Sequence, residues 1–413
     1  VQMLDLQALA QLAERLPLPT AQLRMLRDFA PRGSLRNFSA QWQGAYPDIQ
    51  SYQVKGDFLN LGLAPQVARA ARPATAKTPA QAAVPAIPGF ENLSGHLEAS
   101  DKGGAFQLAS TNTSFVSPAY FSEPTIGFDK LDADAKWKFE KNDMLRLTIR
   151  NLSFAKEDLQ VSLAGMHLMP INKAEKKSPG VIDLSGTVNG LRLDHVGNYL
   201  PLGMPDDVRA WLTHGLVAGT LQDGRLRLKG DLTHFPFHDD RPNDKNRGEF
   251  VFSGKIHDGV LNYAPDMKAP DGKAPMWPLL EKIQGRILFD KARLEVHGDT
   301  GETHGAQVAN VKAVVPDLMS HESVLQIDGT ASGPLQRFLR YTVDSPVGEW
   351  IGHFTDESSG TGNASLALKL DLPLHDMRHA KVNGTLKFAN NGVTLMRDMP
   401  EIAQTNGRLD FDE

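Results

Sequence analysis

Hydrophobic and polar residues alternate along most of the chain, which predicts strands rather than long helices. The stretches LRLTIRNLSF at 145–154 and SLALKLDL at 365–372 place every second side chain on an apolar face. Successive side chains of a strand point to opposite faces, so each stretch has one apolar and one polar face. Residues typical of tight turns separate such stretches at 141–143, 258–259 and 390–392. We therefore predict hairpins that build an antiparallel meander.

Helical periodicity is restricted to a few short segments. Five segments have it, at about 4–15, 20–29, 205–214, 334–341 and 346–353. We expect Trp211 to anchor the third helix on the sheet and Trp350 to anchor the fifth. Gly215 is placed to adopt a left-handed cap at the end of the third helix. The strand that follows is expected to end at Pro236, because proline cannot donate to a β-ladder.

The same order of elements recurs about three times along the chain. VIDLSGTVNG at 181–190 is echoed by VLQIDGTASG at 324–333, and PLLEKIQGRILFD at 278–290 by PEIAQTNGRLDFD at 400–412. The Ala/Pro-rich stretch 64–89 lacks any period and is predicted to be a mobile loop inserted in the first cassette. We predict one continuous body of three helix-strand cassettes, at 1–180, 181–323 and, truncated, 324–413.

About twenty predicted strands offer more apolar surface than five short helices can cover. Exposed apolar surface costs about 25 cal/mol per Å2, so the sheet must form a sandwich, pack on a partner, or curl into a trough. We predict a mainly β fold: an elongated, curled antiparallel β-sheet groove with a few short α-helices at its edge. Alternation by itself leaves open whether the strand leucines form a closed core or line this groove.

The candidate groove-lining residues are apolar side chains that share one face of a predicted strand. They are Trp137, Phe139, Leu145, Leu147, Ile149, Leu226, Leu228, Ile287, Phe289, Leu294, Val296, Leu366, Leu368, Leu370, Leu386 and Phe388.

Composition and charge exclude several classes of function. Hydrophobic residues make up 41% of the 413 residues and charged residues 23%, as in folded proteins. The net charge of −5 gives no basic surface for nucleic acid, so nucleic acid is not an expected partner. The absence of cysteine excludes disulfides and thiol catalysis. No signal peptide is visible, no apolar run approaches the roughly 18 residues that cross a bilayer, and we expect the chain to be part of a larger protein.

Candidate catalytic and metal sites are better explained as turns. His234 and His238 have a spacing that converges only on a helix, which Pro236 between them forbids. The glycine-rich stretch 298–305 matches no nucleotide-binding motif and is predicted to be a turn. The basic cluster 173–179 is interpreted as a solvated turn that could alternatively contact an anionic headgroup. We therefore predict no enzyme activity, no cofactor and no metal.

Three stretches resemble the central, periplasmic portion of the YhdP branch of the AsmA-like family. Residues 198–237 contain Tyr-Leu-Pro, a Trp-Leu helix and a Gly-led strand that ends in Phe-Pro-Phe. Residues 250–290 contain Gly-Val-Leu-Asn-Tyr-Ala-Pro and Trp-Pro, and residues 88–104 are similar to the family as well. The resemblance covers most of the chain.

The resemblance implies a periplasmic part of a large envelope protein of a Gram-negative bacterium. Such proteins are anchored in the inner membrane by an N-terminal helix, which we expect to lie outside this sequence, and other envelope proteins are possible partners. They are implicated in carrying phospholipid to the outer membrane along a hydrophobic β-groove, so the expected function is a lipid-transfer conduit and the expected ligand is phospholipid. The resemblance favours the groove over the core for the candidate residues. The alternative is an extended structural scaffold of the envelope with a closed apolar core.

Overall fold

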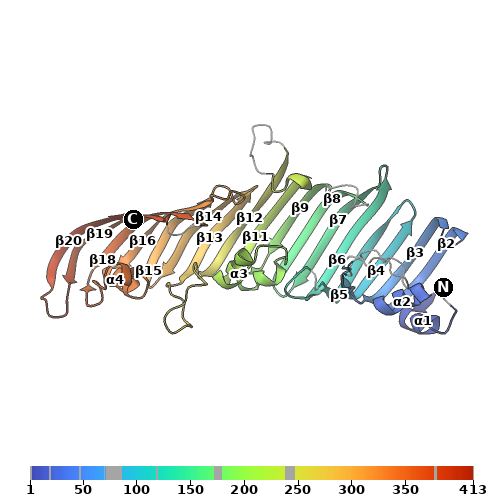
Figure 1. The fold of residues 1–413 in the computed structure, drawn as a ribbon, viewed down its shortest axis with the longest axis horizontal. Coiled ribbons are helices and arrows are strands. Elements are labelled where there is room, and N and C mark those ends of the chain that lie inside the picture. The colour runs from blue at the N-terminus through green and yellow to red at the C-terminus, as the bar shows by residue number, and fades with distance from the viewer. Residues whose placement is uncertain are drawn as a thin grey trace, which may run out of the picture. The chain divides into compact units, whose positions relative to one another are not determined.

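The fold is a broad antiparallel sheet with short helices at one end of its strands (Figure 1). The computed structural model describes residues 2–17, 20–45, 48–68, 70, 86–117, 120–171, 179–237, 247–375 and 379–412. Twenty strands among them belong to a single open sheet. The predicted class, mainly β with an antiparallel sheet and few short helices, is confirmed.

The chain divides into two compact units. Unit 1 comprises Val1–Thr187, Asn198–Pro205 and Lys229–Thr233, and unit 2 comprises Val188–Gly197, Asp206–Leu228 and His234–Glu413. The elements mainly in unit 1 are β1 (Met3–Asp5), α1 (Leu6–Ala13), α2 (Thr20–Phe29), β2 (Arg32–Ala45), β3 (Asp48–Leu63), β4 (Gly89–Ser100), β5 (Gly103–Val116), β6 (Thr125–Glu140), β7 (Met144–Lys156), β8 (Leu159–Pro170) and β9 (Val181–Asn189). Consecutive strands from β2 to β8 pair antiparallel, and β1 pairs with β2.

Unit 2 repeats this arrangement. The elements mainly in unit 2 are β10 (Leu191–Arg192), η1 (Leu193–Tyr199), α3 (Asp206–Gly215), β11 (Leu216–Asp231), β12 (Gly248–Leu261), β13 (Leu280–Asp290), β14 (Arg293–Thr303), β15 (Ala306–Val315), β16 (Val324–Pro334), α4 (Leu335–Val343), α5 (Val347–Trp350), β17 (Ser359–Gly360), β18 (Asn363–Pro373), β19 (Lys381–Thr394) and β20 (Ile402–Asp412). The 3-10 helix η2 (Leu232–His234), which follows β11, lies mainly in unit 1. From β12 to β16 consecutive strands pair antiparallel, and β16, β18, β19 and β20 continue the meander.

In each unit the two ends of the strands differ. The helices lie at one end, which we call the helix edge, and all five predicted helices are found within a few residues of their expected bounds. The opposite ends, which we call the turn edge, carry connections between consecutive strands, some of them tight turns. The turn at 141–143 joins β6 to β7 there in unit 1, and residues 291–292 join β13 to β14 in unit 2. Within the described residues, the α-helices therefore lie at the helix edge, whereas the turn edge carries turns, longer connections and the short 3-10 helix that follows β11.

Two of the three predicted hairpin turns are instead bulges inside strands. The pairing of β12 shifts around Asp258, and that of β19 shifts around Asn390; both residues have a positive φ. A positive φ is also what a tight turn requires, so the same residue types suit either structure. Further strand residues combine a positive φ with a register shift, among them Asn37, Asn60, Asn92, Lys282 and Asn310. Because each bulge increases the local bend and twist of its strand, these residues give the sheet curvature within each unit.

The helix that precedes β11 ends differently from the prediction. Gly215 is its last residue and lacks a positive φ, so it does not form a left-handed cap. Its buried Cα lies under the Trp211 indole, and its carbonyl oxygen accepts a 2.8 Å hydrogen bond from the Asn262 N–H. The strand then ends at Asp231, before Pro236, because residues 232–234 turn into a 3-10 helix.

The Ala/Pro-rich stretch lies mostly outside the described residues, so its predicted mobility stays a prediction. Residues 69 and 71–85 are among those not described. The two ends of the stretch meet, since Gln66 and Ile87 exchange backbone hydrogen bonds of 2.8 and 2.9 Å. The insertion therefore begins and ends at one point of the fold.

Candidate functional site

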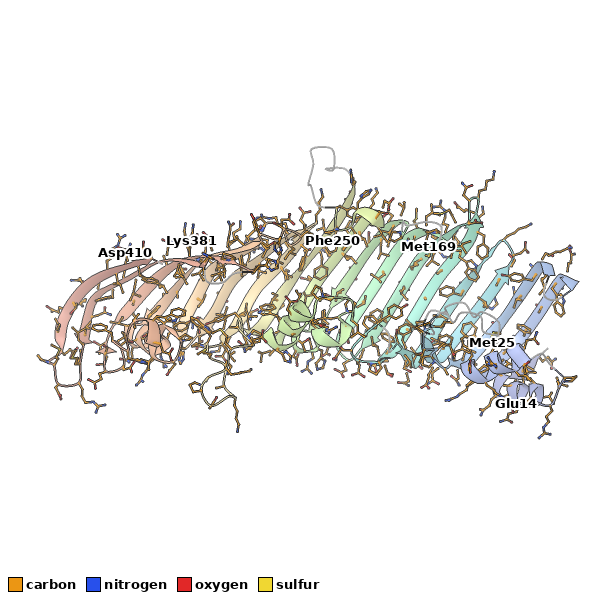
Figure 2. The ribbon with its side chains drawn as sticks, in the orientation of Figure 1. Glu14, Met25, Met169, Phe250, Lys381 and Asp410 are labelled. Atoms are coloured by element: carbon orange, nitrogen blue, oxygen red, sulfur yellow. The ribbon has the colours of Figure 1, made fainter. Side chains whose placement is uncertain are left out.

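The strand register places the five candidate residues of unit 1 on one face of the sheet. Trp137 of β6 lies opposite Leu147 of β7, and Phe139 lies opposite Leu145. Ile149 follows two residues after Leu147 and therefore shares its face. The face continues onto β8, where Met169 is opposite Leu145 at the turn edge (Figure 2).

The register does the same for the candidate residues of unit 2. On β13 and β14, Ile287 is opposite Val296 and Phe289 is opposite Leu294. On β18 and β19, Leu366 is opposite Leu386. The remaining candidates follow by alternation along their own strands: Leu226 and Leu228 on β11, Leu368 and Leu370 on β18, and Phe388 on β19. Each unit thus has an apolar face built from cross-strand pairs.

The apolar faces are not closed into a core. All sixteen candidate residues are half-buried or exposed, and none is fully buried. Among the described residues only 14 hydrophobic residues are fully buried, and six of those are alanine. The chain exposes 25,723 Å2, whereas a compact monomer of its mass exposes roughly 16,000 Å2. Side chains on these faces shield one another but remain open to solvent.

The opposite faces of the strands are charged and solvated. Ion pairs link neighbouring strands there, including Lys55–Glu98 at 2.5 Å, Arg150–Asp134 at 2.6 Å and Lys369–Asp328 at 3.2 Å. Exposed ion pairs of this kind each contribute about 0–1 kcal/mol to the free energy of unfolding. They therefore make this face hydrophilic but add little to the stability of the fold. Each strand pair is therefore amphipathic across its thickness.

One carboxylate on the charged face has a strongly perturbed titration. The pKa of Glu295 is lowered to about 2 because its carboxylate accepts hydrogen bonds from Arg293, at 2.8 Å, and from His297, and faces Lys312. Its side chain is only 15% exposed, so these partners replace much of its hydration. The Glu295 carboxylate is therefore ionised near neutral pH, and its hydrogen bonds tie it to neighbouring side chains of the charged face.

An aromatic cluster joins the helices of unit 2 at the helix edge. Trp277 lies 5.9 Å from Tyr263, 6.5 Å from Tyr341 and 5.7 Å from Trp350, measured between ring centroids. The hydroxyls of Tyr263 and Tyr341 are 2.8 Å apart, and burial raises the pKa of both phenols. Trp211 donates its indole N–H to the Tyr263 carbonyl at 3.2 Å. The cluster therefore fastens the segment 262–279 to α3, α4 and α5.

The role predicted for Trp350 as a helix-to-sheet anchor is wrong. Its side chain is 64% exposed, and its ring contact is with Trp277 of the segment between β12 and β13. A four-residue helix is too short to bury an indole against the sheet, so the ring packs edge-on against a neighbouring loop instead.

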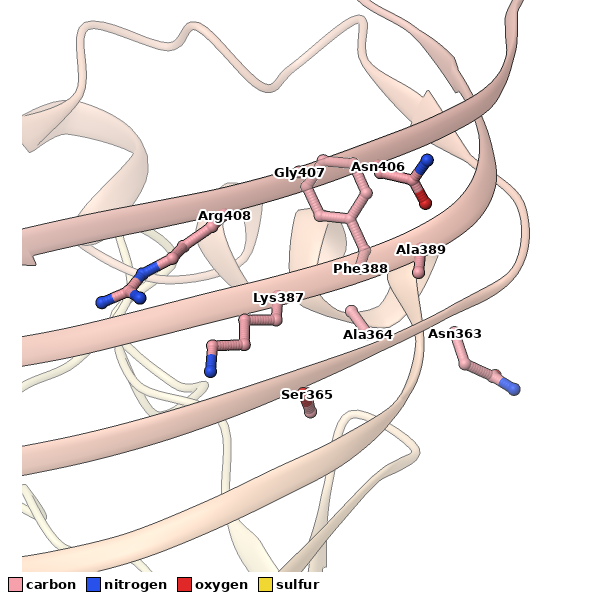
Figure 3. Close-up of a pocket in the computed structure, with 9 residues that line it drawn as sticks. All are labelled: Asn363, Ala364, Ser365, Lys387, Phe388, Ala389, Asn406, Gly407 and Arg408. Atoms are coloured by element: carbon pink, nitrogen blue, oxygen red, sulfur yellow. The ribbon is translucent and has the colours of Figure 1, made fainter.

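Sequence reasoning did not identify three glycines that lie opposite aromatic residues, of which only Trp137 and Phe388 are candidates. Gly104 is opposite Trp137, Gly407 is opposite Phe388, and Gly384 is opposite Phe411. At all three positions a methyl group would overlap the aromatic ring. Phe388 and Gly407 also border an open hollow of about 680 Å3 on β18–β20 (Figure 3). Only the register reveals these pairs, because the partners lie on different strands.

The candidate metal and nucleotide sites weighed from the sequence do not form a metal site in the part of the chain that the structure describes. No group of three potential metal ligands occurs there. His234 approaches Arg247 at 3.2 Å, while His238 and residues 173–178 of the predicted basic cluster 173–179 fall outside the described residues. The glycine-rich stretch predicted as a turn is mostly strand, since β14 continues to Thr303 and only residues 304–305 turn. Among the described helices none is both long and apolar enough to cross a membrane.

Comparisons with known proteins agree on one family. The YhdP protein family matches residues 1–413. The chain is 24% identical over 310 residues to the intermembrane phospholipid transporter YhdP of Escherichia coli strain K12, an alignment that covers 75% of this chain and 22% of that protein. The chain thus corresponds to about a fifth of its relative's length. No solved structure matches the chain.

Proposed function

The chain belongs to the YhdP protein family, and from this premise we propose that it is a periplasmic part of a phospholipid-transfer protein whose apolar sheet faces hold acyl chains. The observation that carries the proposal is the half-exposed state of all sixteen candidate residues. Apolar side chains that stay open to solvent in a folded sheet are available to an apolar ligand.

An open apolar face lowers the free energy that is needed to move an acyl chain between membranes. Moving an acyl chain of about sixteen carbons into water costs roughly 12 kcal/mol, at about 0.8 kcal/mol per CH2. An apolar face removes most of this cost wherever the chain lies on it, while the headgroup stays in water. The process requires neither a nucleophile nor a metal, and we propose no catalytic role for any residue.

The cellular location that we propose is based on the similar Escherichia coli protein. That protein is named as an intermembrane phospholipid transporter. We place this chain in the space between the two membranes of a Gram-negative envelope, as part of a protein anchored in the inner membrane. Phospholipid is its ligand, and other envelope proteins are its partners at either membrane.

The rival function is a structural scaffold with a closed apolar core. A closed core would bury the candidate leucines completely, as folded interiors do. Leu147 of unit 1 and Leu368 of unit 2 are instead only half-buried. The exposure favours lipid binding over the scaffold.

Site-specific crosslinking in cells tests the proposal. A photoreactive phenylalanine analogue is placed either at Leu147, on the apolar face of β7, or at the next residue, Thr148, on its charged face. The chain is exported to the periplasm, irradiated, purified and analysed by mass spectrometry. Phospholipid adducts are expected at position 147 and not at 148. Equal adducts at both positions, or none at 147, would contradict the proposal.

A further inference from the structure

Two phenylalanines of unit 2 lie flat on glycines of the neighbouring strand. Phe411 of β20 is opposite Gly384 of β19, and Phe388 of β19 is opposite Gly407 of β20. The para carbon of each ring is the atom nearest to where a methyl group on its glycine would be. Adjacent strands are about 4.8 Å apart, so a ring whose tip reaches the partner's Cα extends along the sheet and does not stand up from it. Figure 3 shows the Phe388 ring directed over Gly407.

The glycines are not required by the backbone at these positions. Neither Gly384 nor Gly407 has a positive φ, so any residue could adopt its conformation. The three atoms nearest to an added methyl group are all ring atoms, at Gly384 from Phe411 and at Gly407 from Phe388. The one thing that glycine provides at these two positions is room for the ring.

We propose that Gly384 and Gly407 set the depth of the acyl-binding face in unit 2. Each seats a phenylalanine ring flat on the sheet and thereby keeps the space above it clear for an acyl chain. A side chain on either glycine would push the ring up into that space. This inference rests on the proposed function, because it concerns the ligand of the same face.

A similar pair of an aromatic residue and a cross-strand glycine exists in unit 1. Trp137 of β6 lies over Gly104 of β5, and its ring centroid is 6.3 Å from that of Phe106. There a methyl group on the glycine would also overlap the backbone oxygen of Glu98. A substitution at Gly104 would therefore disturb the strand as well as the ring, so the test belongs to unit 2.

A purely structural role for the pairs makes a different prediction. Aromatic rings can stabilise a sheet by covering a cross-strand glycine. If that were their whole role, removing the ring would weaken the sheet and would not improve access for lipid. If the glycines instead set the depth of the acyl-binding face, replacing the phenylalanine ring that an alanine has pushed up should restore the access of lipid to that face.

The experiment uses phosphatidylcholine with a diazirine in one acyl chain, supplied in vesicles to the whole chain. After irradiation, peptide mapping measures labelling of β18–β20, with the peptides of β6–β8 as an internal reference. The variants are Gly384→Ala, Gly407→Ala, the pair Gly384→Ala with Phe411→Leu, and Phe411→Leu alone. Gly127→Ala is the control, because an added methyl group there meets open space. Thermal melting reports whether each variant is folded.

We expect each single glycine variant to lose at least three-fold of its labelling in β18–β20 and none in β6–β8. The double variant and Phe411→Leu should be labelled there as well as the parent, and Gly127→Ala should not change. Undiminished labelling of both glycine variants, or a double variant that is not restored, would overturn the inference. If the glycine variants do not fold, loss of labelling in Phe411→Leu would overturn it. A parent chain that is labelled nowhere would instead refute the proposed function itself.

Discussion

A single residue step along a strand separates two environments in this protein. Leu147 of β7 faces Trp137 and His167 on the apolar face, whereas its neighbour Thr148 faces Lys136 on the charged face. Neither side chain is fully buried. We therefore expect a substitution on the apolar face to change lipid binding more than it changes the stability of the sheet.

The substitution Leu147→Asp tests this at the residue scale. In a closed core the carboxylate would cost several kcal/mol, because it would be buried without a partner. On an open face it reaches water, so the free energy of unfolding is expected to fall by no more than about 1 kcal/mol. Bound phospholipid should nevertheless fall several-fold, because the charge interrupts the apolar face.

Denaturant unfolding and lipid analysis of the same preparation provide the measurement, with Thr148→Asp as the matched control. The control should keep both its stability and its lipid. A variant Leu147→Asp that unfolds would support the closed core instead.

Glu295 provides a prediction about pH. Its folded pKa, about 2, lies below the ordinary value of 4.5, so its contribution to stability is present above about pH 4.5 and is lost as the pH falls towards 2. Glu295→Gln should therefore melt at a lower temperature than the parent at pH 7, and the difference should shrink between pH 4.5 and pH 2. A difference that is constant across this range would show that the hydrogen bonds matter and the charge does not.

At the scale of elements, alternation predicted the strands but could not distinguish a bulge from a turn. Asp258-Gly259 and Asn390-Asn391-Gly392 carry the residue types of a hairpin turn, yet both lie inside a strand. A bulge and a turn each need a residue that tolerates a positive φ, and only the partner strand shows which one forms. For the same reason, the pairing of glycines with aromatic residues on the neighbouring strand could not be predicted from the sequence.

Asn310 tests the role of the bulges. It has a φ of 52°, lies at a register shift between β15 and β16, and is exposed. A β-branched residue is strained there, so Asn310→Val should lower the free energy of unfolding by about 1–2 kcal/mol. Glycine adopts this conformation freely, and Asn310→Gly should be close to neutral. Equal losses in urea unfolding for both variants would mean that the asparagine side chain, rather than its φ, is what stabilises the bulge.

The aromatic cluster at the helix edge is an element that the sequence reveals only in part. Trp211 and Trp350 were predicted to anchor helices on the sheet, but the residues that they contact lie in the segment 262–279, more than 50 residues away in the sequence. Trp277 contacts three aromatic rings, so Trp277→Ala should lower the free energy of unfolding by about 3 kcal/mol. Trp42 is 64% exposed, and Trp42→Ala should change it by less than about 1 kcal/mol. Similar losses of unfolding free energy in the two variants would contradict a stabilising role for the aromatic cluster.

At the scale of the whole molecule, the sequence predicted the open antiparallel sheet and the face on which its apolar residues lie. It did not predict the division into two units, because that depends on contacts between strands distant in sequence. The three cassettes remain a prediction. Equivalent hydrogen bonds support them: Ala64 donates to the carbonyl of Phe29 at the end of α2, as Asn262 does to Gly215 at the end of α3, both at 2.8 Å.

Native mass spectrometry tests the central claim that the apolar faces hold phospholipid. The chain is exported to the periplasm of a Gram-negative host, purified without detergent, and sprayed directly from a volatile buffer. It is then stripped of lipid and incubated with vesicles of phosphatidylethanolamine and phosphatidylglycerol. The account predicts phospholipid bound to the purified chain and recovered after incubation. A folded chain that is purified without lipid and acquires none from the vesicles would contradict it.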